Sequence, residues 1–327
     1  MQQPFEQLDQ VIQQGRNVVL TTHISPDGDG LGSELALAAY LKSRGKTTAI
    51  LNHSALPSTY DFLDPEHVIL QYNDAQHRSA IESADVILVV DTNHPDRLAG
   101  MKDIVLASKA TKVIIDHHLD PDPFADLEVI DASAAATGLI IFQFLSSRKN
   151  FSLSKEIATA LYVAILTDTG SFRFPKTDGT LHRAVASLID AGADPVQIYQ
   201  DVYERALLGR IRLLGMALQN LSTTHDGQVA YLTIPRSMFT ETGTGEADTD
   251  NFAPYALGLN GVRIGLMFIE TDEVIKISFR SKGDIWINKL AQEFGGNGHK
   301  NAAGARIAGG NLASVVTEVL EHSKRYL

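Results

Sequence analysis

The first half of this 327-residue chain alternates apolar, strand-like runs with segments whose apolar residues recur at helical spacing. Strands of a parallel sheet are buried on both faces, so they are continuously apolar instead of alternating with polar residues. The run Val86–Val90 contains only valine, isoleucine and leucine. This alternation predicts an α/β fold with a doubly wound parallel sheet, covered by helices on both faces.

The limits of the expected elements follow from the apolar runs and from stop signals such as Gly45, just past a helical segment. Strands are predicted over Asn17–Thr22, Lys46–Leu51, Val86–Val90, Lys112–Ile115 and Leu127–Ile130. Helices are predicted over Leu31–Ser43, Ala136–Ser147, Lys155–Leu166 and Leu181–Ala191.

The second half predicts a smaller α+β domain. Pro195–Asn220 is expected to be helical with few breaks, so we predict domains over residues 1–192 and 222–327 with a helical connector over 193–221. Asp226-Gly227 lies between two strand-like runs and predicts a hairpin. The expected strands are Leu221–Thr224, Val229–Ile234, Val262–Glu270, Val274–Arg280 and Ala305–Ile307, the helices Ile285–Phe294 and Leu312–His322, and a polar loop Glu241–Asp250.

Length and composition agree with two domains at roughly 150 residues each. No stretch approaches the ~18–20 apolar residues that span a bilayer, and Met1–Glu6 lacks the features of a secretory signal. The chain has no cysteine, which excludes disulfides, thiolate metal sites and cysteine nucleophiles. We therefore expect a cytoplasmic protein with no membrane partner.

The net charge of -11 bears on possible partners. Proteins hold long nucleic acids mainly by neutralising phosphates with Lys and Arg, so we expect no binding of long duplexes. Excess acid is commonly a solvated surface. The alternative is that some of the carboxylates bind divalent cations.

Acidic and imidazole side chains follow several of the predicted elements. His23, Asp27 and Asp29 come after the first strand, and Asp91 follows Val86–Val90. The other members of this set are Asp116, His117 and His118 after the fourth strand, and Asp168 after the helix Lys155–Leu166. Because the carboxyl ends of parallel strands share one edge, distant residues of this kind meet in one crevice.

Oxygen and nitrogen ligands without sulfur suit Mn²⁺ or Mg²⁺, with Zn²⁺, Fe²⁺ or Co²⁺ as alternatives. Clustered aspartates would repel one another without cations, and paired divalent ions are the usual device for phosphoester hydrolysis. Each segment, taken alone, also has a purely structural interpretation. Asp27-Gly28-Asp29 could be a turn, and Asp91 or Asp168 a helix cap. The coincidence of all four segments at one edge favours a metal site.

The four motifs resemble those of the DHH phosphoesterase superfamily: His23-x-x-x-Asp27-x-Asp29, Asp91, Asp116-His117-His118 and Asp168. The segment Gly295–Gly304 is similar to the glycine-rich signature of the DHH-associated C-terminal domain, which binds substrate. That signature usually has glycine where this chain has Asn297, a mild departure because Asn tolerates left-handed backbone. Within the superfamily the chain most resembles the nanoRNase and pAp phosphatase group.

The resemblance implies a two-metal phosphoesterase, using Mn²⁺ with Mg²⁺ or Co²⁺ possible, that cleaves short oligonucleotides to nucleoside monophosphates or pAp to AMP and phosphate. One ion would be held by His23, Asp27 and Asp91, the other by Asp29, Asp91, His117 and Asp168. His118 would face the scissile phosphate, and Asp116 would orient a ligand histidine. The implied substrate-binding residues are Arg280, His299, Gly295, Gly296, Gly298 and, more weakly, Arg263. A homodimer is also implied.

Other functions stay open at this point. A cyclic or linear dinucleotide phosphodiesterase, a pyrophosphatase or an exopolyphosphatase would use the same centre, although the glycine signature disfavours a plain pyrophosphatase. A nucleotide-binding sensor without turnover is the main alternative outside enzymes, and the full ligand set argues against it. A structural interaction protein would leave the acid–imidazole cluster unexplained.

Overall fold

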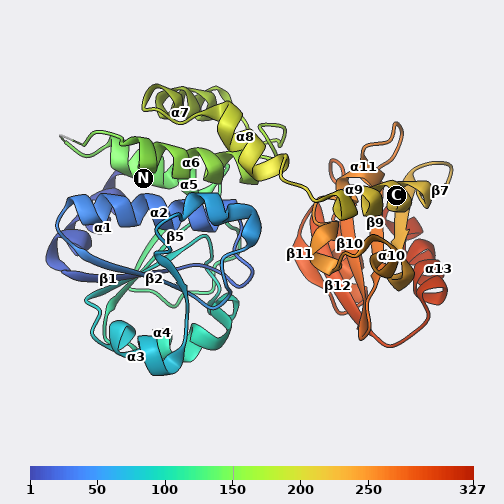
Figure 1. Cartoon of the computed structure of the whole chain (residues 1–327), viewed down its shortest axis with the longest axis horizontal. Helices are drawn as coiled ribbons and strands as arrows, with labels where there is room; N and C mark the ends of the chain where they lie inside the picture. Colours follow the sequence, from blue (N-terminus) through green and yellow to red (C-terminus); the bar gives the residue numbers. More distant parts are fainter. Residues whose placement is uncertain (150) are drawn as a thin grey trace. The chain divides into compact units, whose positions relative to one another are not determined.

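In the computed structural model the chain folds into two compact units, Met1–Arg205 and Ala206–Leu327 (Figure 1). The structure describes residues 1–149 and 151–327, including the backbone but not the side chain of His299. The boundary between the units falls inside the segment predicted as a connector.

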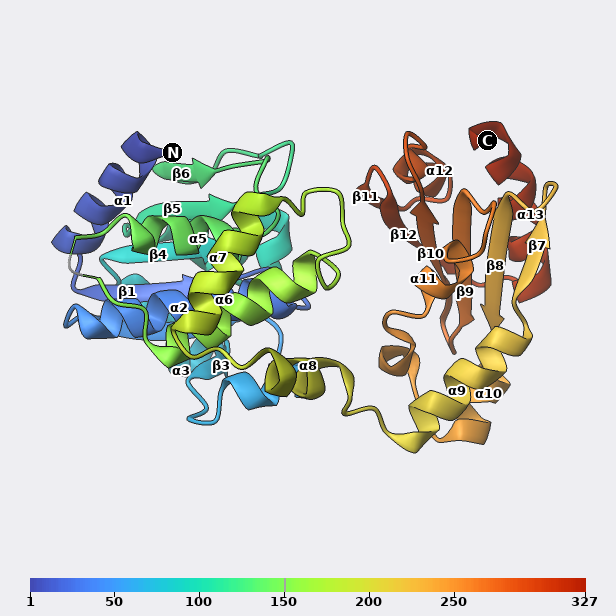
Figure 2. The same cartoon turned by 90° about the horizontal axis from the view of Figure 1, so that it is seen from above.

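The described part of the first unit contains one sheet of six strands, all parallel (Figure 2). The order β3-β2-β1-β4-β5-β6 makes β1 and β4 central neighbours. The strands are β1 Asn17–Thr21, β2 Thr47–Asn52, β3 Ile69–Gln71, β4 Val86–Val90, β5 Thr111–Asp116 and β6 Leu127–Ile130. The predicted α/β class is confirmed.

Helices cover both faces of this sheet (Figure 1). On one face lie α1 Gln2–Gln14, α2 Gly28–Ser43, α5 Thr137–Ser146, α6 Lys155–Asp168, α7 Gly179–Asp190 and α8 Pro195–Tyr203. On the other lie α3 Asp74–Glu82, α4 Lys102–Ala107 and the 3-10 turn η2 Pro95–Met101. A second 3-10 turn, η1 Ser58–Leu63, packs on the first face.

Strand β4 shows why its sequence is continuously apolar. Leu88 and Val90 enter the core under α2 and α6, whereas Ile87 and Val89 enter the core under α3 and α4. All four are fully buried, and each such side chain contributes about 1.5–3 kcal/mol relative to an exposed position. Neither face of the strand is left for polar residues.

Helices α2 and α1 are two of the places where the structure differs from the sequence prediction. Helix α2 begins at Gly28, three residues earlier than expected, because the Asp27 side chain accepts hydrogen bonds from the amides of Asp29 (3.0 Å) and Gly30 (3.3 Å). Helix α1 was not predicted, although its buried residues Phe5, Leu8 and Ile12 recur at helical spacing.

Over residues 206–327 a second sheet has the strand order β11-β12-β10-β9-β8-β7. Its pairs are antiparallel except β8 with β9. The strands are β7 Ser222–Thr224, β8 Val229–Ile234, β9 Ile264–Glu270, β10 Val274–Ser281, β11 Asn297–His299 and β12 Ala302–Ala308. The hairpin predicted at Asp226-Gly227 is confirmed.

Helices pack on both faces of the second sheet as well. Helices α12 Ile287–Glu293 and α13 Leu312–Ser323 cover one face. Helices α9 Leu208–Gln219, α10 Arg236–Thr242 and α11 Ala253–Leu257 cover the other. The predicted loop Glu241–Asp250 contains the end of α10 and a 3-10 turn, η3 Glu246–Thr249, and a last turn, η4, covers Lys324–Tyr326.

The expected helix Pro195–Asn220 is not continuous. It is broken between α8 and α9 at residues 204–207. Ile198 and Val202 of α8 enter the first core, and Leu213 and Ala217 of α9 enter a core of the second unit. The two halves of the segment therefore stabilise different units.

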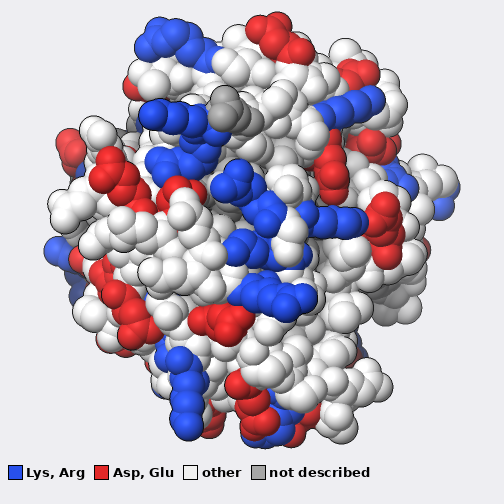
Figure 3. Space-filling view, turned by 90° about the vertical axis from the view of Figure 1, so that its left-hand side faces the viewer, with Lys and Arg blue, Asp and Glu red and all other residues white. Residues whose placement is uncertain are grey.

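One face of the first unit carries both basic and acidic side chains (Figure 3). On the left-hand face of the first unit, Lys and Arg gather across the middle with Asp and Glu around them (Figure 3). Within the described residues, no helix has both the length and the apolar character that a membrane crossing needs.

Candidate metal centre

The carboxyl ends of β1, β4 and β5 bring the predicted site residues of the first unit together. His23 lies two residues beyond β1, Asp91 directly follows β4, and His117 directly follows β5. Asp29 lies in the first turn of α2, and Asp168 is the last residue of α6. The strand order places β1, β4 and β5 side by side, so their ends form one edge.

A first group of ligand atoms comes from His23, Asp27 and Asp91. His23 Nε2 lies 3.3 Å from Asp91 Oδ2 and 3.9 Å from Asp27 Oδ1. His23 Nδ1 faces the carbonyl oxygen of Ile24 at 2.9 Å, which directs Nε2 toward the carboxylates. One nitrogen and two carboxylates therefore converge at this point.

A second group comes from Asp29, His117 and Asp168. His117 Nε2 lies 3.3 Å from Asp168 Oδ2 and 3.8 Å from Asp29 Oδ2. It also lies 3.7 Å from Asp91 Oδ1, whereas Oδ2 of Asp91 faces His23. Asp91 thus stands between the two groups with one oxygen toward each.

The backbone of Asp91 has φ of +60°, a left-handed conformation that non-glycine residues seldom adopt. Its amide donates to Ile115 O of β5 at 3.0 Å, and its Oδ1 accepts the hydroxyl of Thr137 at 3.0 Å. These bonds hold a strained turn, of a kind that clusters at functional sites.

The two adjacent histidines have different surroundings. His118 Nδ1 lies 2.7 Å from Asp116 Oδ1, and the same oxygen accepts the His117 amide at 2.8 Å. His117 Nδ1 instead faces Ala134 O at 3.4 Å. Asp116 therefore orients the His118 ring and the His117 backbone, but it does not hold the His117 ring.

Charge and burial shift the acid–base properties of this cluster. Burial, reinforced by the charge of Asp91, raises the pKa of Asp168 to about 8, and burial with Asp91 and Asp168 raises the pKa of Asp29 well above its ordinary value. Burial lowers the pKa of His117, which favours its neutral form. Burial also opposes charge on His23, but hydrogen bonds to Asp27 and Asp91 outweigh it and raise the pKa of His23 to about 10.

These residues fit divalent cations. His117 Nε2 is buried and has no hydrogen-bond partner among the described residues, although three carboxylates lie within 4 Å of it. Ligand atoms of one octahedral ion with 2.1 Å bonds lie about 3 Å apart, close to the shorter separations here. A cation would pair this nitrogen and relieve the repulsion that raises the carboxylate pKa values.

Three further residues that contribute to the site were not predicted. Thr137 N and Gly138 N, at the start of α5, donate to Asp29 at 2.7 and 2.8 Å. Lys176 Nζ donates to Ala134 O at 3.0 Å, and its charge acts on His117 and Asp168. The pattern Thr137-Gly138 at an expected helix start is a usable signal, but nothing in the sequence ties it to Asp29.

A buried polar network lies behind the first group. Asn52 Oδ1 accepts the amide of Thr22 at 3.1 Å, and Thr22 Oγ1 donates to Val90 O at 2.9 Å. Asn52 Nδ2 donates to Glu34 Oε2 at 2.8 Å. The network thereby ties the residues that precede His23 and Asp91 to each other.

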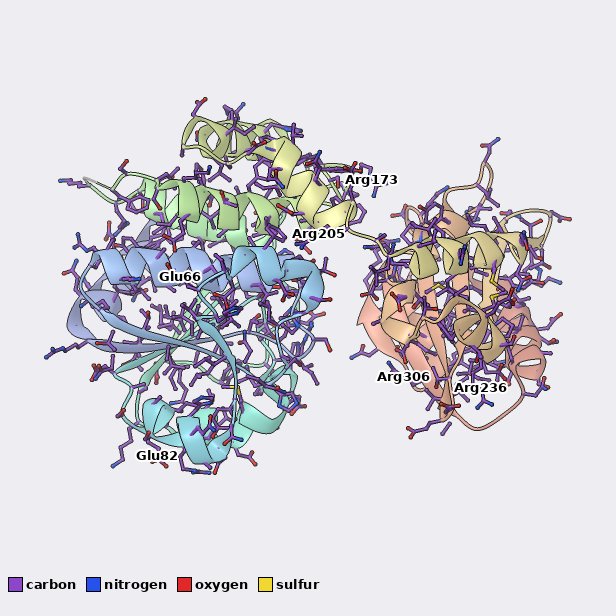
Figure 4. The ribbon with its side chains drawn as sticks, viewed as in Figure 1. Glu66, Glu82, Arg173, Arg205, Arg236 and Arg306 are labelled. Atoms are coloured by element: carbon purple, nitrogen blue, oxygen red, sulfur yellow. The ribbon has the colours of Figure 1, made fainter. Side chains whose placement is uncertain are left out.

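In the second unit, Arg280 lies near the end of β10, opposite Ala302 of β12. Its Nη1 donates to the carbonyl oxygens of Phe279 (2.9 Å) and Ala303 (3.5 Å), and burial lowers its pKa. Among the described side chains no carboxylate pairs with it. By contrast, Arg306 and Arg236 (Figure 4) pair with Glu246 and Asp272.

The other predicted substrate residues are less open to a ligand. Arg263 Nη1 donates to Leu327 O at 2.5 Å, so its guanidinium is engaged by the last residue of the chain. The amides of Gly295, Gly296 and Gly298 donate to Gln292 O, Ala291 O and Asn297 Oδ1. The predicted contact of His299 falls on a side chain outside the described residues.

Glycine is nevertheless required in this loop. Gly295 has φ of +69° and Gly298 has φ of +150°, conformations that other residues avoid. A Cβ on Gly296 would lie 2.3 Å from Gly304 O. The glycines therefore bring β11 close to β12 and close the end of α12.

Comparison with known proteins bears on both units. Residues 17–165 match the DHH family, N-terminal domain, and residues 226–327 match the DHHA1 domain. A structure named as an exopolyphosphatase-related protein from Bacteroides fragilis is 30% identical, with a TM-score of 0.95 over 99% of this chain and 97% of that chain. The α/β fold and its acid–imidazole edge are those of a DHH-type protein. The chain belongs to the DHH family and carries a DHHA1 domain, so the resemblance drawn from its motifs is confirmed.

Two relatives have more specific names. The bifunctional oligoribonuclease and PAP phosphatase NrnA of Bacillus subtilis is 28% identical over 306 residues, which cover 93% of each protein. The protein of the same name from Thermus thermophilus is 29% identical over 304 residues, 93% of this chain and 88% of its own length.

Proposed function

We propose that this protein is a divalent-metal phosphoesterase that hydrolyses short oligonucleotides to nucleoside monophosphates and pAp to AMP and phosphate. The observation that carries the proposal is the pair of ligand groups joined by Asp91, one around His23 and one around His117. Centres of this kind with ions ~3.5–4 Å apart are typical of phosphoester hydrolysis. The names of the two NrnA relatives support the choice of substrate.

In this proposal His23, Asp27 and Asp91 hold one ion, and Asp29, Asp91, His117 and Asp168 hold the other. When bound, the ions supply Lewis acidity, which polarises phosphoryl oxygens and lowers the pKa of water. Mn²⁺ is the ion we expect, with Mg²⁺ or Co²⁺ as substitutes, because the ligands offer nitrogen and carboxylate oxygen without sulfur.

The chain's own groups supply the rest. Asp116 fixes the ring of His118 through the 2.7 Å contact at Nδ1, and we assign to this ring a hydrogen bond to the substrate phosphate. Burial disfavours a proton on His118, but the bond to Asp116 outweighs it and raises the pKa of His118, which supports a protonated, phosphate-binding ring. Asp116 is then a positioning residue.

Substrate selection is assigned to the second unit. Arg280 lacks a carboxylate partner among the described residues, and a guanidinium suits the terminal phosphate of a short substrate. His299 and the glycines of residues 295–298 complete the proposed binding segment, with Arg263 as a weaker member. A homodimer and a cytoplasmic location remain predictions.

Polyphosphate is a second candidate substrate, favoured by the name of the Bacteroides fragilis structure. A cyclic or linear dinucleotide phosphodiesterase is another alternative that uses the same centre. Neither requires a different set of metal ligands, so substrate assays must separate them.

The test is a substrate panel assayed with Mn²⁺, Mg²⁺ and Co²⁺. The panel contains di- to pentanucleotides, pAp, cyclic dinucleotides and polyphosphate, and each is offered to the wild type and to Asp91→Asn. We expect release of monophosphates from the short oligonucleotides and phosphate from pAp, with loss of activity and of bound metal in Asp91→Asn. Absence of hydrolysis in a metal-loaded wild type would refute the proposal.

A further inference from the structure

Trp286 is the chain's single tryptophan and is 51% exposed. Tryptophan is highly buried on average, so an open indole is informative. It directly precedes α12, and the next residue donates its amide to Lys300 O across 2.7 Å. Helix α12 packs on β11 and β12 (Figure 2). Trp286 therefore lies beside the end of the glycine segment to which we assigned substrate binding.

The ammonium groups of two lysines lie over the ring of this indole. Lys289 Nζ lies 5.2 Å and Lys300 Nζ 5.7 Å from the ring centroid, both within the range of cation–π attraction. Lys300 also pairs with Asp284 at 3.1 Å, on an exposed carboxylate. An aromatic face with two nearby ammonium groups matches a ligand that carries both a flat ring and negative charge.

The same region holds Arg280, whose Nη1 donates to two carbonyl oxygens and which has no carboxylate partner among the described residues. Ser281, next to it, donates its amide to Asn301 O at 3.0 Å, and Asn301 Nδ2 donates to Ser281 Oγ at 2.9 Å. The end of β10 is thus tied to the turn that carries Lys300, and that turn is tied to the start of α12. Short backbone hydrogen bonds connect the three segments that present Arg280, Lys300 and Trp286.

We propose that Trp286 is the platform on which a base of the nucleotide substrate stacks, while Lys289 and Lys300 receive its phosphate charge. The inference rests on the proposed function and adds the residue that distinguishes nucleotides from other phosphoesters. Stacking on an aromatic side chain tolerates every base, because each base has a π face. The site would therefore prefer substrates with a base but not one particular sequence.

The single indole makes a direct binding test possible. The emission of Trp286 is followed in metal-free buffer while AMP or ribose 5-phosphate is added, with excitation at the red edge to avoid adenine absorption. We expect saturable quenching by AMP and little change with ribose 5-phosphate. Equal responses to the two ligands would overturn the proposal, because the base would then make no contact.

The kinetic test compares Trp286→Leu, Trp286→Tyr and the control Tyr255→Leu, an equally open aromatic residue on α11 (48% exposed). Substrates are a dinucleotide and the same compound with an abasic sugar at one position. Trp286→Leu should raise KM for the dinucleotide roughly tenfold with little change in kcat. Trp286→Tyr keeps an aromatic ring, so its KM should be close to that of the wild type. Trp286→Leu should not change KM for the abasic substrate, and the control Tyr255→Leu should not change KM for either substrate.

The outcomes separate the two proposals. If the wild type cleaves the dinucleotide and Trp286→Leu has the same KM, the stacking role is wrong and the proposed function stands. If Trp286→Leu changes only the oligomeric state in sedimentation, Trp286 is an interface residue and the stacking role is again wrong. If the wild type cleaves nothing but AMP still quenches the indole, the proposed function fails while nucleotide binding stands.

Discussion

The hydroxyl of Thr137 donates to Asp91 Oδ1 across 3.0 Å, although 46 positions separate the two residues in the sequence. The amide of Thr137 also donates to Asp29 Oδ2 at 2.7 Å. One residue at the start of α5 thus fixes a carboxylate shared by both ligand groups and a carboxylate of the second group.

Replacing Thr137 with Ala should therefore weaken metal binding without removing a ligand. Groups that orient metal ligands typically matter by roughly 10–100-fold in affinity, and we expect a loss in this range for Mn²⁺ measured by calorimetry. Thr137→Ser keeps the hydroxyl and should stay within a few-fold of the wild type. Equal affinity for Thr137→Ala and the wild type would show that the hydrogen bond does not position Asp91.

The same residue shows where prediction from the sequence ends. Asp91 is recognisable because a fully buried strand, β4, has only apolar residues and its polar successor is conspicuous. No comparable sequence signal identifies Thr137, because its role depends on how α5 packs beside α2. Strand β3 was missed for a related reason, because it has three residues and only Ile69 is buried.

Hydrogen bonds within the second unit involve several of the predicted substrate residues. The glycine signature predicted the loop at residues 295–298, yet its amides are occupied by acceptors that only the folded unit supplies. Likewise, nothing in the sequence indicates that Arg263 donates to Leu327 O. The composition and spacing of residues show where a site lies. Whether its hydrogen-bond donors already have acceptors within the protein depends on tertiary structure.

Glu34 should make stability depend on pH. It is fully buried, its Oε1 has no partner among the described residues, and burial raises its pKa to about 8 despite the bond from Asn52. A carboxyl whose pKa is raised on folding favours the folded state below its unfolded pKa, near 4.5, and loses that contribution as pH rises through 8. The wild type should thus lose stability between these values.

The variant Glu34→Gln keeps the shape and cannot ionise, so its melting temperature should fall less from pH 5 to pH 9. The difference between the two proteins should be on the order of several °C at the alkaline end. Thermal melts of both, after metal removal, isolate this group from the other titrating residues. Parallel curves for the two proteins would mean that Glu34 does not titrate in this range.

Close packing of α2 on α6 should be sensitive to a single methyl group. A Cβ on Gly32 would lie 2.3 Å from Ala160 O and 3.1 Å from Ala164 Cβ, so Gly32→Ala must push apart the helices that carry Asp29 and Asp168. We expect destabilisation of about 1–3 kcal/mol and weaker Mn²⁺ binding.

The matched control is Gly215→Ala in helix α9, where a Cβ would meet no described atom within 4 Å. This change should stabilise the protein by about 0.5–1 kcal/mol, because Ala is the better helix former. Denaturant unfolding measures both variants. A neutral Gly32→Ala would mean that the two helices have room to adjust.

Asp116→Asn should separate positioning from metal binding. The amide oxygen of Asn can still accept from His118 Nδ1, but the negative charge that raises the pKa of His118 is gone. The alkaline limb of the pH–rate profile should therefore move to lower pH, and kcat should fall by roughly 10–100-fold. Metal content should not change, because Asp116 belongs to neither proposed ligand set.

The control variant is Asp126→Asn. Asp126 accepts the Lys112 amide at the opposite end of β5 (2.8 Å), so this variant should leave the pH–rate profile unaltered. Loss of bound Mn²⁺ in Asp116→Asn with an unshifted limb would instead make Asp116 part of the metal site.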